Sequence, residues 1–121
     1  MHLQQINVEE FHRACNIPIG SSIAIRRPDL RKNLIEEECK ELIEAIDNED
    51  LIEAIDAMCD LQVVVLGTAV EWGIDLQPFW DEVHKTNMAK KDGPVREDGK
   101  QLKPEGWKPP DIEGILERSL D

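Results

Sequence analysis

The sequence lacks the features that mark secreted, membrane-spanning and zinc-binding proteins. No apolar run approaches the roughly 20 residues that cross a bilayer, and residues 1–10 have neither the basic start nor the apolar core of a signal peptide. The three cysteines form no CxxC pair, and the glycine motifs of P-loop and Rossmann proteins are missing. We therefore expect a cytoplasmic protein with free thiols and no membrane partner.

Aromatic residues are also scarce, at 4% of the chain, beside 40% hydrophobic and 33% charged residues. This composition is too apolar for a disordered acidic chain and too polar for a membrane protein. A length of 121 residues favours one domain over residues 1–121. Because a core of this size is modest, helices that expose functional groups often dimerise to bury their remaining apolar surface.

Basic residues are too few to balance the acidic ones, and the net charge is −12. This balance argues against a nucleic-acid polymer as partner, because a nucleic-acid backbone needs a basic surface. Residues 29–60 carry twelve acidic side chains against three basic ones, whereas residues 84–108 carry seven basic against four acidic. A small phosphate substrate is compatible with this pattern if cations lie between it and the carboxylates.

Apolar periodicity predicts an all-α fold, in which a helical bundle of four main helices is followed by an extended tail. The predicted helices are residues 7–16, 30–47, 51–72 and 76–91, with a short last helix at 112–119. The polar turn at 47–50 should return the third helix antiparallel to the second. The run 63–66 could form a strand by itself, but its place in a long helical pattern favours a helix. Residues 92–121 hold the C-terminal basic tail and the short last helix, so the core helices occupy about 7–91.

Acidic residues recur at helical spacing on the second and third predicted helices: Glu37, Glu38 and Glu41, then Glu53, Asp56 and Asp60. Residues three and four positions apart share a helix face, so each set forms an acidic face, and the turn between the helices would bring the two faces together. Asp60 lies in an otherwise apolar stretch, where a charge is rare unless it is paired or bound to a metal.

Clustered carboxylates repel one another, and the basic residues nearby are too few to compensate them. Hard divalent cations suit such oxygen ligands, and two ions could neutralise substrate phosphates and activate a water molecule. A solvated acidic face is the alternative for a generic EExxE string, but the position of Asp60 makes that alternative less favourable.

The segment EECKE at 37–41, followed by the acidic pair in DAMCD at 56–60, resembles the MazG-like all-α NTP pyrophosphohydrolases. That superfamily includes the dimeric dUTPases and phosphoribosyl-ATP pyrophosphohydrolase. The resemblance continues through 61–73 and FWDEVHKTNMAK at 79–90, and the tail at 96–111 is similar to that of small stand-alone bacterial and phage members. It implies a homodimer or homotetramer that cleaves the α–β phosphoanhydride of a nucleoside triphosphate with Mg²⁺ or Mn²⁺, at two or three ions per site.

The resemblance also implies roles for individual acidic residues. Glu38 and Glu41 would be metal ligands, and Glu37 would position or deprotonate the attacking water. Asp60 matches the last residue of the ExxD motif on the next helix.

One position departs from the family pattern, because the glutamate of ExxD would fall at position 57, where this chain has Ala57. Asp56, one turn before Asp60, is our first choice for the missing metal ligand. Glu53 is the second choice, since Glu53 and Asp56 form a literal ExxD one turn earlier.

Polar and basic residues at the end of the fourth helix and on the tail are expected to bind substrate phosphates: Asn87, Lys90, Lys91 and Arg96. Asn87 and Lys90 match the NMxK string of the family. Lys100 and Lys103 lie on a tail that could fold over the site of the same or a neighbouring subunit. The alternative is a solvated basic tail.

The base of the substrate is the least determined feature. His12 and Ile17 are weak candidates for lining a base pocket, and Trp80 for stacking on a base, with local packing as the alternative for each. Phage members with similar tails act on purine nucleotides such as GTP and dGTP, which favours a purine deoxynucleotide, while related members take dUTP or dCTP.

Two other functional classes are alternatives to a hydrolase. One is a non-enzymatic dimeric adaptor with an acidic face, and the other is a dinuclear metal oxidase.

Overall fold

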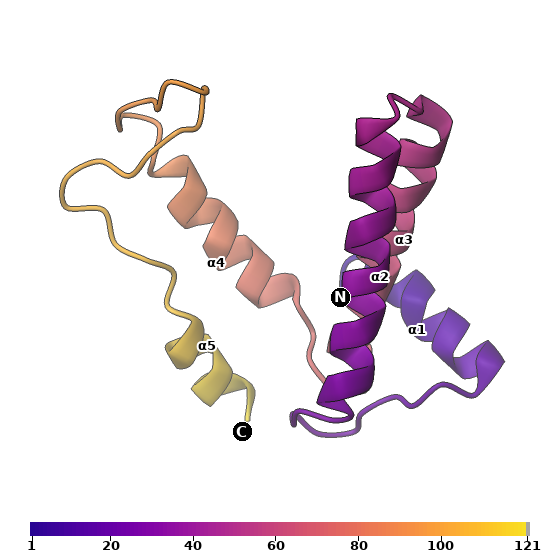
Figure 1. Ribbon diagram of the computed structural model, residues 1–121. Coiled ribbons are helices and arrows are strands. Elements are labelled where there is room, and N and C mark those ends of the chain that lie inside the picture. Colours follow the sequence, from indigo (N-terminus) through magenta and orange to yellow (C-terminus); the bar gives the residue numbers. More distant parts are fainter. Residues whose placement is uncertain (121) are drawn as a thin grey trace. The chain divides into compact units, whose positions relative to one another are not determined.

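The computed structural model describes residues 1–120, which form five α-helices (Figure 1). The helices are α1 (Leu3–Cys15), α2 (Pro28–Asp47), α3 (Leu51–Glu71), α4 (Gln77–Met88) and α5 (Ile112–Ser119). No strand occurs in residues 1–120, where Val95 and Gln101 form an isolated antiparallel bridge. The all-α class predicted from the apolar periodicity is therefore confirmed.

The chain divides into two compact units, one of residues Met1–Asp75 and one that starts at Leu76. The first unit holds α1, α2 and α3, and the second holds α4, the tail and α5. In the described part of the chain, no helix combines the length and the apolar character that a membrane span requires. The single domain expected over residues 1–121 stays a prediction.

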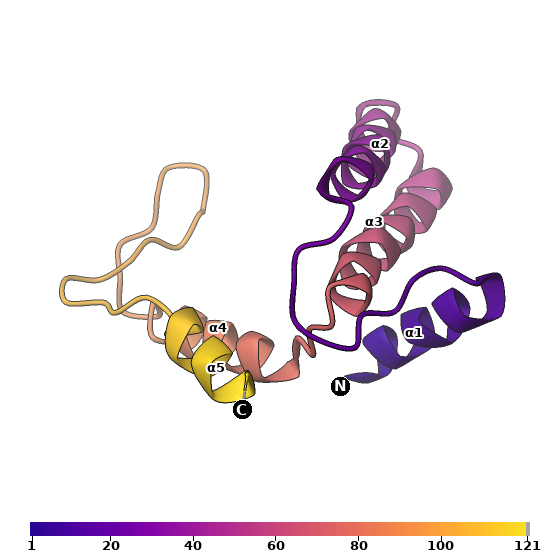
Figure 2. The same cartoon turned by 90° about the horizontal axis from the view of Figure 1, so that it is seen from below.

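In the first unit, α2 and α3 form an antiparallel hairpin and α1 packs against α3 (Figure 2). Pro28 is the first residue of α2, a position that suits proline because the first N–H groups of a helix have no helical partner. The Asp50 carboxylate accepts a hydrogen bond from the Glu53 N–H at 3.1 Å and caps α3. The run 63–66 lies inside α3, so its interpretation as helix is confirmed.

Most helix ends lie within two residues of the prediction, and two differ by more. α1 begins before residue 7, because the His2 ring accepts a hydrogen bond from the Gln5 N–H at 3.3 Å and caps the helix earlier. α4 ends at Met88 rather than at residue 91, and the Lys91 N–H donates to the Met88 carbonyl at 3.3 Å in a tight turn. Lys90 and Lys91 therefore follow the helix instead of ending it.

The core of the first unit is built mainly from small side chains. Its buried hydrophobic residues are Val8, Ala45, Ala54, Ala57, Leu66, Ala69 and Val70. Several larger apolar side chains on α2 and α3 lie exposed instead: Ile43, Ile46, Leu51, Ile52, Ile55 and Met58. Exposed apolar side chains that recur along two paired helices are candidates for burial against another protein surface.

Candidate metal centre

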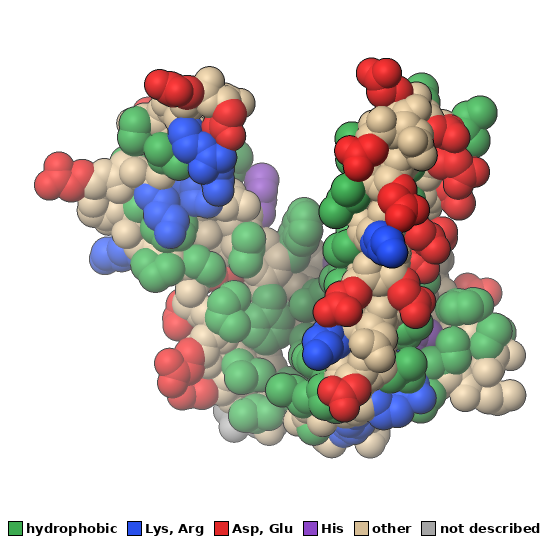
Figure 3. Space-filling model, viewed as in Figure 1, with side chains coloured by type: hydrophobic (Ala, Val, Ile, Leu, Met, Phe, Trp, Pro, Cys, Tyr) green, Lys and Arg blue, Asp and Glu red, His purple; other side chains and the backbone are tan. Residues whose placement is uncertain are grey.

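Three carboxylates of the hairpin come together at one place. Glu38 and Glu41 extend from α2 and Asp60 extends from α3, and one oxygen atom from each lies within 4.8 Å of the other two. Glu38 and Asp60 are half-buried and Glu41 is exposed. Figure 3 shows the acidic side chains that gather along α2. The hairpin thus brings together three of the residues that the sequence predicted as metal ligands.

Glu38 is the least well compensated member of this cluster. Its Oε2 atom is buried and has no hydrogen-bond partner among the described residues. Burial raises the pKa of the Glu38 carboxyl above its ordinary value, and the contact with Glu41 raises it further. The negative charges of Asp60 and Glu37 act in the same direction.

No lysine or arginine nitrogen of residues 1–120 lies within 4.0 Å of these three carboxylates. A buried carboxylate without a hydrogen-bond donor or a cation is costly, because its negative charge is desolvated. The donor set of three carboxylates and the unpartnered Oε2 atom fit a hard divalent cation, which prefers oxygen ligands.

A pocket of about 200 Å³ adjoins the cluster along the hairpin. Its lining residues are Glu41, Glu44, Ala45, Asn48, Asp50, Glu53, Asp56 and Ala57. Asp56 and Glu53 thus share a pocket with Glu41, although neither belongs to the group of three carboxylates. Ala57, which stands where the family pattern has glutamate, is buried in the wall of this pocket.

Glu37 is exposed on α2, next to the cluster in sequence. Its charge contributes to the raised pKa of Glu38, so the two carboxylates are close enough to interact. An exposed carboxylate beside the cluster is free to accept a proton or a hydrogen bond from a solvent molecule.

The expected phosphate-binding residues belong to the second unit: Asn87, Lys90, Lys91 and Arg96. Asn87 and Lys91 are exposed, and Lys90 is half-buried. Arg96 forms a two-pronged ion pair with Asp98, in which Nε lies 2.8 Å from Oδ1 and Nη2 lies 2.6 Å from Oδ2. Its guanidinium is therefore engaged within the tail.

The three candidate base-binding residues lie in different settings. His12 is buried, and its Nδ1 atom lies 3.1 Å from the Pro18 carbonyl oxygen. Ile17 is half-buried, and its N–H donates to the His12 carbonyl at 2.8 Å. Trp80 belongs to the second unit and is 64% exposed.

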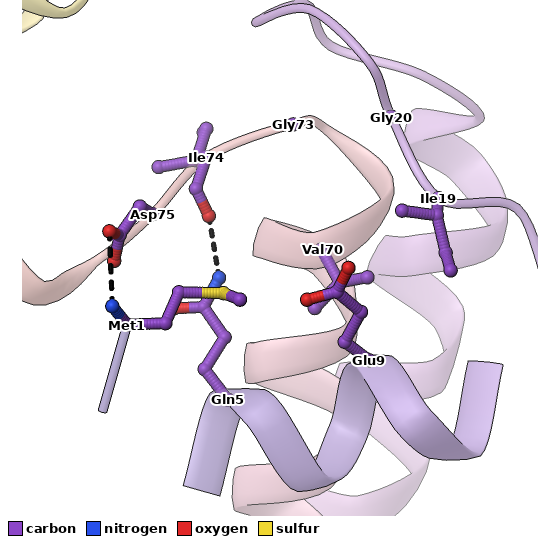
Figure 4. A pocket seen from close by; sticks show the side chains of 9 residues that line it. All are labelled: Met1, Gln5, Glu9, Ile19, Gly20, Val70, Gly73, Ile74 and Asp75. Carbon is purple, nitrogen blue, oxygen red and sulfur yellow. Dashed lines mark hydrogen bonds and ion pairs between the residues drawn. The ribbon is translucent and has the colours of Figure 1, made fainter. Parts of the chain in front are cut away.

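Another pocket, of about 310 Å³, lies near the C-terminal end of α3 (Figure 4). Its lining residues are Met1, Gln5, Glu9, Ile19, Gly20, Val70, Gly73, Ile74 and Asp75. The Gln5 side chain donates a hydrogen bond to the Ile74 carbonyl at 2.6 Å, which joins α1 to the segment after α3. Neither His12 nor Ile17 is among the lining residues.

A buried charged group that was not predicted from the sequence lies where the start of α2 meets the end of α3. Glu71, at the end of α3, is 1% exposed and pairs with both Arg27 and Arg31. The signal was present in the sequence, because Glu71 ends an apolar stretch just as Asp60 interrupts one. Here arginines, rather than a metal ion, compensate the buried carboxylate.

Residues 8–87 match the phosphoribosyl-ATP pyrophosphohydrolase family, abbreviated PRA-PH. No curated protein is significantly similar to the chain. The family match includes both acidic helices, the carboxylate cluster and α4 up to Asn87. The chain therefore belongs to the phosphoribosyl-ATP pyrophosphohydrolase family, a divalent-metal-dependent branch of the MazG-like all-α NTP pyrophosphohydrolase superfamily.

Proposed function

We propose that this pyrophosphohydrolase cleaves the α–β phosphoanhydride of a nucleoside triphosphate and releases the monophosphate and pyrophosphate. The family match supports a pyrophosphohydrolase acting on a nucleotide-like substrate. The observation that carries the proposal is the cluster of Glu38, Glu41 and Asp60, with its unpartnered Glu38 oxygen. A triphosphate is strongly anionic, so an acidic site can bind it only together with cations.

In this proposal Glu38, Glu41 and Asp60 hold Mg²⁺ or Mn²⁺, at two or three ions per site. Asp56 supplies the ligand that Ala57 cannot supply, and Glu53 is the second choice for this role, because both line the pocket shared with Glu41. When bound, the metal supplies charge neutralisation on the phosphates and a lowered pKa for water.

The remaining chemistry falls to groups of the chain itself. Glu37 positions the attacking water through a hydrogen bond and accepts its proton, a role that suits an exposed carboxylate beside the cluster. Asn87, Lys90 and Lys91 bind phosphate oxygens. Arg96 contributes only after its ion pair with Asp98 opens, so we assign it a smaller share.

For the substrate we favour a purine deoxynucleotide, with dGTP and GTP as the leading candidates. His12, Ile17 and Trp80 are the candidate base contacts. A dUTP or dCTP pyrophosphatase is the alternative within this fold. Phosphoribosyl-ATP is a second candidate substrate, because the matching family is named for the hydrolysis of this compound.

We further propose a homodimer or homotetramer in which a helical bundle is completed between subunits. The apolar side chains exposed on α2 and α3 support this arrangement, because Ile52 is 79% and Leu51 70% exposed in the single chain. Burial of such side chains against a second copy is favourable by about 1.5–3 kcal/mol for each residue.

The central test is a panel of common NTPs, dNTPs and phosphoribosyl-ATP, incubated with Mg²⁺ and assayed for pyrophosphate and the nucleotide product. We expect release of a monophosphate, and a loss of turnover of about 10²-fold or more in Glu38→Gln and Asp60→Asn. Glu36→Gln is the matched control, because Glu36 is an exposed carboxylate on the same helix.

The same variants separate the enzyme from its rivals. A non-enzymatic adaptor should show no divalent site in calorimetry with MnCl₂ and no turnover with any nucleotide. A dinuclear oxidase should purify with iron and lose it in the same variants. Normal turnover in Glu38→Gln with an intact helical signal would refute the assignment of the site.

A further inference from the structure

A single guanidinium joins α2 to three successive turns of α3. Arg31 on α2 donates from Nη1 to the Glu71 carboxylate and from Nε to the Thr68 hydroxyl, both at 3.2 Å. Its Nη2 atom donates to the Val64 carbonyl at 3.4 Å. The three acceptors follow one another at helical spacing, so they lie along one face of α3 over about 10 Å.

The surface of α3 is open at the place where this guanidinium lies against it. The buried Gly67 has no side chain there, and a Cβ atom on it would stand 2.8 Å from Arg31 Nη2 and 2.9 Å from His12 Nε2. Glycine weakens the middle of a helix, so its use here needs a reason. The close approach of Arg31 supplies that reason.

The carboxylate cluster lies on the same faces of the two helices. Glu38 follows Arg31 on α2 by seven residues, which is about two helical turns. On α3, Asp60 precedes Val64 by four residues, which is about one turn. The contact between Arg31 and Val64 and the meeting of Glu38 with Asp60 therefore require the same register of the two helices along their axes.

The cluster lies between two fixed points of the hairpin, the turn at 47–50 and the contacts of Arg31. The buried apolar side chains toward the turn are the small ones of Ala45, Ala54 and Ala57. Apolar burial has no preferred direction, so it does not by itself exclude a small slide of one helix along the other. The carboxylates also repel one another, which opposes their approach in the absence of a cation.

We propose that Arg31 is a positioning residue for the metal centre. Its three contacts with α3 fix the register that holds Glu38, Glu41 and Asp60 together before an ion binds. A buried ion pair often adds little net stability compared with an apolar pair, but it can select one arrangement of the helices. Ligands that are already in place bind a metal more tightly, because binding no longer has to order them. This inference rests on the proposed function, since it assigns Arg31 to the metal centre of that reaction.

The variant Arg31→Lys separates geometry from charge. Lysine keeps a positive charge beside Glu71, but a single ammonium cannot reproduce the planar fork of a guanidinium. We expect the Kd for Mn²⁺, measured by calorimetry, to rise about tenfold or more. The kcat at saturating Mn²⁺ should change less, because the bound ions then draw the carboxylates together. An unchanged Kd would overturn the inference.

Arg27→Gln is the matched control. Arg27 pairs with the same Glu71 carboxylate, but its side chain is 45% exposed, and within residues 1–120 its guanidinium donates to Glu71 alone. This variant should bind Mn²⁺ like the native protein. A loss as large as that of Arg31→Lys would assign the effect to Glu71 pairing in general and would contradict the positioning role.

A double variant, Arg31→Met with Glu71→Met, tests whether the pair acts on register or on folding. Both charges leave together, and the Thr68 hydroxyl keeps its hydrogen bond to the Val64 carbonyl at 2.8 Å. We therefore expect a cooperative unfolding transition, as in the native protein, and a Kd for Mn²⁺ raised about tenfold or more. Loss of the transition, or native Mn²⁺ affinity, would count against the inference.

The register can also be measured without metal or nucleotide. Nitroxide labels are attached at Lys40→Cys on α2 and Gln62→Cys on α3, two exposed positions, after the three native cysteines are replaced by serine. Pulsed electron paramagnetic resonance on the metal-free protein should give one narrow distance distribution. Arg31→Lys should shift or broaden this distribution, and Arg27→Gln should leave it in place.

Failure of this inference is distinguishable from failure of the proposed function. If the native protein binds Mn²⁺ and hydrolyses nucleotides, but Arg31→Lys keeps the native label distance and the native Kd, only the positioning role is refuted. If Arg31→Lys changes the label distance but the native protein has no Mn²⁺ site or hydrolyses no nucleotide, the proposed function is refuted and the effect of Arg31 on the register stands.

Discussion

Arg31 on α2 and Glu71 on α3 form an ion pair inside the first unit, with Nη1 3.2 Å from Oε2 and side chains only 5% and 1% exposed. Arg31 also donates from Nε to the Thr68 hydroxyl at 3.2 Å, and the Arg27 guanidinium contacts the other Glu71 oxygen. This network joins the start of α2 to the end of α3. Neither arginine pairs with Glu38, Glu41 or Asp60, so these carboxylates have no basic partner in residues 1–120.

Replacement of Glu71 by glutamine should destabilise the protein by about 3–5 kcal/mol, because the buried Arg31 loses its counter-charge. Chemical denaturation followed by circular dichroism measures this loss. Glu9→Gln is the control, since Glu9 pairs with Arg13 at 3.1 Å on the surface, where an ion pair contributes about 0–1 kcal/mol. Similar losses in both variants would show that the Glu71 pair is no more important than a surface pair.

Stability should fall as the pH drops below the ordinary histidine pKa of 6.5, in part because of His12. Burial lowers the pKa of His12, and the positive charge of Arg31 acts in the same direction, although the Pro18 carbonyl opposes it. The unfolded chain therefore takes up a proton at a pH where the folded chain does not, so acid favours unfolding.

The free energy of unfolding between pH 7.5 and 5.5 tests this linkage. His12→Gln should have a flatter dependence on pH than the native protein, and the exposed His84→Gln should keep the native dependence. An NMR titration in which the His12 ring protonates above pH 6.5 would contradict the predicted direction.

Without metal, Glu38→Gln should raise the melting temperature, because it removes a carboxylate whose charge is disfavoured by burial and by its acidic neighbours. With Mn²⁺ the native protein should melt at a higher temperature than Glu38→Gln. A metal at 100 times its Kd stabilises the folded state by about 2.7 kcal/mol. We expect this stabilisation in the native protein and in Glu36→Gln, but not in Glu38→Gln. Equal Mn²⁺ stabilisation of Glu38→Gln would exclude the cluster as the metal site.

Asp56 and Glu53 are the two candidates for the metal ligand that Ala57 cannot supply, and both line the pocket next to Glu41. We expect Asp56→Asn to weaken Mn²⁺ binding about tenfold or more, and Glu53→Gln to weaken it less. Calorimetry on the two variants decides between them. A larger loss in Glu53→Gln would assign the ligand to Glu53.

The native protein should sediment as a dimer or tetramer, and Ile52→Asp should weaken association about tenfold or more, because an exposed apolar side chain of the hairpin becomes charged. Ile25→Asp is the control, as Ile25 is 70% exposed but lies outside the helices. A native monomer at micromolar concentration, or equal weakening in the control, would refute this interface.

Much of the fold follows from local patterns. The 3.6-residue period of the apolar residues indicated the four longer helices, and the polar turn at 47–50 indicated the hairpin. Helix ends were less predictable, because the His2 cap and the turn after Met88 depend on single hydrogen bonds that the apolar pattern does not contain.

The sequence alone determined the helical class, the acidic faces of two neighbouring helices and the resemblance that led to the family. These features depend on spacing along the chain, and spacing is local. Only the tertiary structure decided which carboxylates meet, that Arg31 compensates Glu71, and that the Arg31 guanidinium contacts three turns of α3. Each of these requires residues distant in sequence to lie a few ångströms apart, and packing sets that distance.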